Sequence, residues 1–211
     1  MAENSCLARP MSAISQPRKQ PRQARSRHAV AAILEAAARI LAHDGYAAFN
    51  TNRVAELSGV GIGSLYQYFP NKQALLAALH RRHGEETLAA LDEALARSAG
   101  RSAREQLAAL VGAALDLHRR ELGLHRVLER EWPIYDEPPA SNPIDVELHA
   151  RIAAWLADAG GDPARAGLLL RMADSLVHGL LLDADPQAEG LDDAITDALA
   201  GYLALPARHH T

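Results

Sequence analysis

Residues 51–72, with the sequence TNRVAELSGVGIGSLYQYFPNK, constrain the fold of this chain more than any other stretch. They predict two short helices joined by a tight turn at Gly59, where glycine meets no steric penalty. The first helix has a narrow apolar face that comprises Val54, Ala55 and Leu57. The second repeats apolar residues at i, i+3, i+4 and i+7, namely Ile62, Leu65, Tyr66 and Phe69.

The ends of these helices carry their own signals. Thr51 is expected to cap the first helix through its hydroxyl. Pro70 ends the second helix, because the residue before a proline is forced out of helical geometry, and Asn71 can cap the helix that follows. Two short helices around a glycine turn are typical of the helix-turn-helix motif, whose second helix enters the major groove of DNA.

The run VAELSGVGIGSLYQYFPNKQALL, preceded by RHAVAAILEAAARILAHDGYAAFNTNRVAE, resembles the DNA-binding domain of the TetR family of transcriptional regulators. The resemblance covers roughly residues 26–82 and includes Gly45, Tyr46, Thr51, the L-Y-x-Y-F cluster and the P-x-K that follows it. The family often has a serine where Gly61 stands and a lysine or polar residue where Ile62 stands. The contact roles of these two positions therefore depart from the family pattern.

The side of the motif opposite its apolar face is predicted to contact DNA. Helix N-termini attract phosphate, exposed side chains can reach base edges, and Gln67 could contact adenine in bidentate fashion. The predicted DNA-binding residues are Thr51, Asn52, Arg53, Gly61, Gly63, Ser64, Tyr66, Gln67, Tyr68 and Lys72. The resemblance implies backbone contacts for Thr51, Ser64, Tyr66, Tyr68 and Lys72, and base-facing positions for Gly63 and Gln67.

The charge of the chain is divided between its two parts. Residues 1–83 contain eleven Lys or Arg and four Asp or Glu, which gives +7, and the remaining residues carry −11 of the total of −4. A basic part that binds nucleic acid, joined to an acidic part that does not, would show such a division.

Residues 1–25 contain several prolines and arginines with few apolar residues, and they are expected to form a disordered basic arm.

The composition favours an all-α fold of about nine helices, because Ala and Leu are abundant, aromatic residues make up 4%, and no alternating strand pattern occurs. We expect a three-helix helix-turn-helix domain over residues 26–82, whose first helix spans 27–44. A helical effector-binding and dimerisation domain should follow over 83–205. Helices are expected at about 72–97, from about 107, at 121–131, from about 144, at 163–183 and at 191–203.

No membrane span or signal peptide is evident, so a cytoplasmic location is expected.

Two functions are expected of the second domain. Regulators that this chain resembles bind a small molecule among their middle helices and dimerise through their last two. The candidate pocket residues are Leu115, His118, Leu128, Trp132, Trp155, Met172, Leu176 and His178. The candidate dimer residues are Leu168, Leu169, Leu176, Leu180, Leu191, Ile195, Leu199 and Tyr202. Each pocket candidate also fits an ordinary core position, and the two helices could instead pack only within one chain.

No catalytic residue, metal ligand or cofactor is predicted. The single cysteine, Cys6, lies in the expected arm, no phosphate-binding glycine loop occurs, and the histidines lack tight ligand spacing. The sequence thus predicts a homodimeric transcriptional regulator, most simply a ligand-released repressor at a near-palindromic operator, and not an enzyme. Two alternatives remain open: an activator, and a helical small-molecule-binding protein whose motif no longer binds DNA.

Overall fold

The computed structural model describes residues 24–120, 143–183 and 189–205, and within these ranges the chain is helical and contains no strand. The all-α prediction is therefore confirmed. The chain divides after Arg81 into two compact units, one residue before the boundary expected from the sequence. Most of the expected arm over residues 1–25 lies outside the described residues, although the first helix already begins at Ala24.

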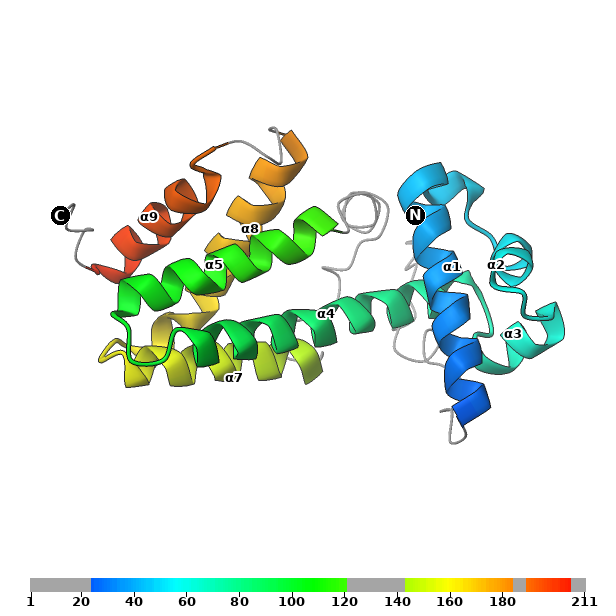
Figure 1. Ribbon diagram of the computed structural model, residues 1–211, viewed down its shortest axis with the longest axis horizontal. Helices are drawn as coiled ribbons and strands as arrows, with labels where there is room; N and C mark the ends of the chain where they lie inside the picture. The colour runs from blue at the N-terminus through cyan, green and yellow to red at the C-terminus, as the bar shows by residue number, and fades with distance from the viewer. Residues whose placement is uncertain (1–23, 121–142, 184–188, 206–211) are drawn as a thin grey trace, which may run out of the picture. The chain divides into compact units, whose positions relative to one another are not determined.

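The first unit contains α1 (Ala24–Ala48), α2 (Thr51–Ser58), α3 (Ile62–Tyr68) and the start of α4 (Lys72–Arg97), as Figure 1 shows. The helix α1 forms because its apolar residues recur at helical spacing, and it buries them against α2 and its neighbours. The buried stripe comprises Ile33, Leu34, Ala37, Ile40 and Leu41. Gly45 has a φ of 73° and interrupts α1 directly after residue 44, where the first helix was expected to end, although α1 resumes and continues to Ala48.

The start of α2 corrects one prediction. Asn50, and not Thr51, caps this helix, because Asn50 has extended backbone geometry and its side chain accepts a hydrogen bond of 2.9 Å from the backbone N–H of Arg53. Thr51 is the first helical residue. At the other end Gly59 adopts the left-handed conformation with a φ of 68°, as the turn requires.

The core of this motif is smaller than the sequence suggests. Val54, Leu65 and Phe69 are almost completely buried, as predicted, and Phe49 is buried with them. Leu57, however, is 50% exposed, so its expected place in the core was wrong. Asn71 accepts a 2.8 Å hydrogen bond from the N–H of Ala74 and so caps α4, which confirms the prediction for this residue.

The second unit is built from the later part of α4 together with α5 (Ala103–Arg120), α7 (Pro143–Asp158), α8 (Ala166–Asp183) and α9 (Leu191–Leu203). A single 3₁₀ turn at Pro163–Arg165 precedes α8. In Figure 1, α5 packs against α8 and α9, and α7 lies alongside α4. The helix predicted at 121–131 and the proline-rich loop after it lie outside the described residues.

A capping box begins α5. The Ser102 hydroxyl and the Glu105 carboxylate each accept a hydrogen bond from the other residue's backbone N–H, at 3.3 and 2.9 Å. The bonds from Ser102 lower the pKa of Glu105. From here α5 runs beside α9, where Arg119 donates to Asp192 at 2.8 Å and Arg104 pairs with Asp197.

One apolar core joins α5, α7, α8 and α9. Its largest member, Trp155, is 5% exposed and donates a 2.7 Å hydrogen bond from its indole nitrogen to the Gln106 side chain. The remaining members include Leu107, Leu110, Val111, Leu115, Ile152, Leu156, Leu169, Val177, Leu191, Ile195 and Leu199. Over 24–120, 143–183 and 189–205, no helix is long and apolar enough to cross a membrane.

Candidate nucleic-acid interface

The helix α3 has one buried side and one solvent-exposed side. Leu65 is completely buried, whereas Ile62 and Tyr66, which were expected on the same apolar face, are 39% and 43% exposed. Among the predicted DNA-binding residues, those that are exposed are Asn52, Arg53, Gly61, Gly63, Ser64, Tyr66 and Gln67. Thr51, Tyr68 and Lys72 are half-buried. Most of the predicted residues are thus accessible to solvent.

Gly63 stands in the first turn of α3, and the fold itself does not require a glycine there. Its φ is not positive, and a methyl group built on its Cα would meet no atom within 4 Å. Gly59 differs, because its left-handed backbone explains the glycine. The open space above Gly63 is therefore available to an incoming surface, and the bare backbone lets that surface approach closely.

The two short helices are tied together at this surface. The hydroxyls of Thr51, in the first turn of α2, and Tyr66, on α3, lie 2.9 Å apart and share a hydrogen bond. Arg53 donates to Asp44 of α1 at 2.7 Å between two largely exposed side chains. Arg53 was predicted to bind DNA, but the sequence did not reveal Asp44 as its partner. The Asp44 carboxylate offsets part of the positive charge of Arg53.

Lys72 is held by a residue that the site prediction omitted. Its ammonium group lies 3.4 Å from the centre of the Tyr46 ring and 3.1 Å from the Tyr46 carbonyl oxygen, to which it donates. The Phe49 ring lies further away, at 5.5 Å. Tyr46 belongs to the motif that carries the family resemblance, so the sequence contained the signal without showing this contact. In this geometry Lys72 secures the start of α4 against the end of α1.

The candidate pocket residues separate into several groups. Leu115 and Trp155 belong to the core, and Leu128 and Trp132 lie outside the described residues. Met172 and Leu176, on α8, are partly buried against that core. His118 and His178 contact each other, with their Nε2 atoms 2.9 Å apart, although 60 residues separate them in the sequence. Spacing along the chain could not reveal this pair.

His118 has an unusual electrostatic setting. It is 7% exposed, and its burial, together with the charge of His178, lowers the pKa of His118 to about 4. A third histidine that the sequence analysis did not consider, His83 on α4, lies edge-on to the His118 ring at 5.2 Å between centroids. At neutral pH His118 is therefore uncharged.

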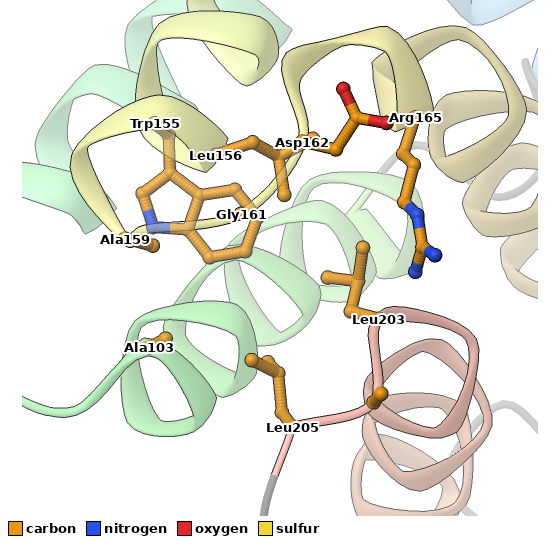
Figure 2. A pocket seen from close by; sticks show the side chains of 10 residues that line it. Ala103, Trp155, Leu156, Ala159, Gly161, Asp162, Arg165, Leu203 and Leu205 are labelled. Atoms are coloured by element: carbon orange, nitrogen blue, oxygen red, sulfur yellow. The ribbon is translucent and has the colours of Figure 1, made fainter.

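A cavity of about 270 Å³ occurs elsewhere in the second unit, between the start of α5 and the ends of α7 and α9. In Figure 2 the Trp155 ring faces it from one side, while Leu203 and Leu205 face it from α9 and the residues after it. Of the candidate pocket residues only Trp155 lines this cavity, beside Arg165 and Asp162. The cavity therefore does not coincide with the pocket expected from the sequence.

The candidate dimer residues differ sharply in exposure. Leu169, Leu191, Ile195 and Leu199 are buried in the chain's own core, so they support the surface from beneath and cannot form it. The helical periodicity identified the apolar face of α9 correctly but not what covers it. Leu168 is 48% exposed, and three further candidates are half-buried, namely Leu176, Leu180 and Tyr202.

The two units and the surface of α3 define a helix-turn-helix protein with a separate helical C-terminal unit. The model of the bacterial regulatory proteins of the tetR family matches residues 33–79, and that of the tetracyclin repressor-like C-terminal domain matches residues 102–203. Together they cover more than half of the chain. The chain belongs to the TetR family of transcriptional regulators.

Sequence relatives agree with this assignment. The chain is 30% identical over 155 residues to the HTH-type transcriptional repressor KstR of Mycolicibacterium smegmatis, a match that covers 73% of this chain and 63% of KstR. It is 28% identical over 85 residues to the fatty acid metabolism regulator protein of Bacillus subtilis, which covers 40% of this chain and 43% of that protein. The chain thus spans about two thirds or less of the length of these relatives.

Solved structures show the same fold. The fatty acid degradation regulator FadR of Bacillus halodurans superposes with a TM-score of 0.66 at 18% identity, over 89% of this chain and all of that one. FadR of Bacillus subtilis in complex with stearoyl-CoA superposes with a TM-score of 0.64 at 20% identity, over 80% and 96%. At such identities the likeness concerns the fold alone.

Proposed function

We propose that this chain is a cytoplasmic repressor that binds a near-palindromic operator as a homodimer and leaves it when a small molecule binds. The observation that carries the proposal is the exposed side of α3, where Gly63, Ser64 and Gln67 stand clear of the protein's own packing. A recognition helix needs a surface of this kind, because side chains and backbone must reach the base edges of the major groove.

The remaining residues of the surface fit contacts to phosphates. Thr51 and Asn52 lie in the first turn of α2, where helix amides favour an anion. Tyr66 and Tyr68 bring hydroxyl groups beside them. Lys72 contributes positive charge from its place on the Tyr46 ring, so we assign it a positioning role as well as an electrostatic one. The net charge of +7 over residues 1–83 attracts DNA at long range.

We propose that α8 and α9 provide the dimer contact. Leu168 on α8 is a large apolar side chain left 48% exposed, and half-buried Leu176, Leu180 and Tyr202 lie on the same two helices. Two copies of such a pair of helices can form a symmetric four-helix interface.

The effector is proposed to bind in the second unit near Met172, Leu176 and His178, where α8 carries apolar and polar side chains side by side. The fatty acid regulator of Bacillus subtilis was solved with stearoyl-CoA, and the partly apolar surroundings here suit a small molecule with an apolar portion. Such a ligand would release DNA only to the extent that it binds the DNA-free arrangement of the two subunits more tightly.

Footprinting on the DNA upstream of the protein's own gene tests this proposal. We expect protection of two related half-sites whose centres lie one or more helical turns apart, about 34 Å per turn. Protection of a single half-site would contradict the dimeric arrangement. Protection of no site at any protein concentration would favour the alternative in which the motif does not bind DNA.

A further inference from the structure

Three helices of the second unit bring histidines together at one point. His118 comes from the last turn of α5, His178 from α8 and His83 from α4. The rings of His118 and His178 meet edge to face with centroids 4.6 Å apart, and their Nε2 atoms are separated by 2.9 Å. The function proposed above places an effector near His178 but assigns no role to the contact between the two rings.

The opposite nitrogens of the two rings fix where the protons lie. His118 Nδ1 lies 2.7 Å from the carbonyl oxygen of Ala114, which can only accept a hydrogen bond, so Nδ1 carries the hydrogen. His178 Nδ1 lies 3.0 Å from the Asp174 carboxylate, one turn earlier on α8. This second contact deviates from the direction of the N–H bond and is an electrostatic one, but a carboxylate still favours the hydrogen on the nitrogen that faces it.

His118 Nε2 therefore carries a lone pair, and at 2.9 Å it can accept a hydrogen bond from Nε2 of His178. A metal ion between the two nitrogens would take the place of that hydrogen. We propose that His118 and His178 bind one divalent transition-metal ion through their Nε2 atoms. The site goes beyond the DNA-binding function, and it is one that sequence spacing did not predict.

The surroundings of the pair match those of metal-binding histidines. Such histidines direct their second nitrogen at a backbone carbonyl or a carboxylate, which sets the tautomer and orients the ring. His118 has the carbonyl of Ala114 and His178 has Asp174 in these places. Zn²⁺–N bonds of about 2.0–2.1 Å in tetrahedral geometry would place the two nitrogens about 3.3 Å apart, so the rings need to separate by about 0.4 Å.

The ligand type selects the class of ion. Imidazole nitrogen suits Zn²⁺, Ni²⁺ and Cu²⁺, whereas Mg²⁺ and Ca²⁺ prefer oxygen. Over 24–120, 143–183 and 189–205, no three His, Cys, Asp or Glu side chains form a complete ligand group. The remaining coordination positions therefore fall to water or to an effector atom. His83 packs against the ring of His118, and its Nε2 lies 3.4 Å from the Thr87 hydroxyl, so we assign it a packing role.

The proposed site can be reached from solvent on the His178 side. The His178 side chain is 15% exposed, and the Asp174 carboxylate beside it is 47% exposed, so a hydrated cation can approach from solvent along α8.

Titration of the metal-free full chain with Zn²⁺ by calorimetry at pH 7.5 tests the proposal. We expect one ion per chain in the tightest step and loss of that step in His118→Gln, His178→Gln and the double variant. Asp174→Asn should weaken binding by roughly 10–100-fold, because it removes only the group behind His178. His149→Gln changes an exposed histidine on α7 and should leave the step intact.

Cu²⁺ provides a second measurement on the unaltered protein, which holds even if a variant fails to fold. Its electron paramagnetic resonance spectrum should show coupling to two imidazole nitrogens. A wild-type titration no tighter than that of the double variant would overturn the proposal, because the pair would then share only a proton. A tight step that survives in folded His118→Gln and His178→Gln, with no two-nitrogen spectrum, would also overturn it.

Discussion

Gly63 is a position where the stability of the fold and the binding of DNA favour different residues. Among the residues that the structure describes, no atom lies within 4 Å of a methyl group built on Gly63, and its φ is not positive, so its backbone accepts other residues. Replacing it with alanine should therefore stabilise the fold by up to about 1 kcal/mol, since alanine is the better helix former. The same methyl group should weaken operator binding about tenfold or more, because a close backbone approach is lost.

Chemical denaturation and fragment-binding titrations measure these two effects separately. Gly112→Ala on α5 is the matched control, because that glycine is also helical with no neighbour within 4 Å, and it should gain stability without losing affinity. Unchanged affinity for the Gly63→Ala protein would show that α3 does not approach DNA at this position.

His118 gives the second unit a pH dependence of known sign. The pKa of His118 is about 4 in the folded chain and 6.5 in the unfolded chain. At pH values between these two pKa values, the unfolded chain therefore binds a proton at this residue and the folded chain does not. The free energy of unfolding should hence fall as the pH drops from 7 to 5, by about 2 kcal/mol from this residue. Denaturation in the presence of a chelator, compared with His118→Gln, isolates this contribution. An equal loss of stability in both proteins would contradict the assignment.

At the scale of single elements, the cap of α2 decides how firmly the motif is held. Asn50 satisfies the N–H of Arg53, so Asn50→Ala should destabilise the first unit by about 1 kcal/mol. Asn52→Ala is the matched control, because Asn52 lies inside α2 and does not cap it. Thermal unfolding of the three proteins makes the comparison. Equal losses from both substitutions would mean that the cap contributes nothing.

The sequence predicts helices better than it predicts their partners. Periodicity and capping residues predicted the limits of α4 and α9, because each helix must bury one face and satisfy its ends. The sequence placed the cap of α2 one residue late, since Asn50 and Thr51 are both good capping residues. It missed Tyr46 beneath Lys72 and the His118–His178 contact, because those pairs form only when separate helices pack.

At the scale of the whole molecule, the proposed dimer requires the second unit to bring two recognition helices together. We expect Leu168→Glu to convert the dimer into monomers, because it places a charge on the exposed apolar surface of α8. Val146→Glu, at a residue of α7 that is 50% exposed, should leave the dimer intact. Analytical ultracentrifugation distinguishes the two states. A Leu168→Glu protein that remains a dimer would exclude this surface as the contact.

The charge division of the chain, +7 over residues 1–83 and −11 over the rest, favours DNA contacts from the N-terminal part of the chain. Because phosphate contacts release counterions, the affinity should fall steeply as salt is raised. Base contacts depend on hydrogen bonds rather than on released ions. The preference for the operator sequence over other DNA should therefore change less with salt than the affinity itself does.

The most direct test of this account is binding of the purified protein to its own upstream DNA, and to a shuffled fragment of equal length, across a series of salt concentrations. The account predicts a strong preference for the upstream fragment at every salt concentration, with log K falling linearly with log salt on both fragments. Equal and weak binding to the two fragments would contradict it, and the motif would then be no more than a basic surface.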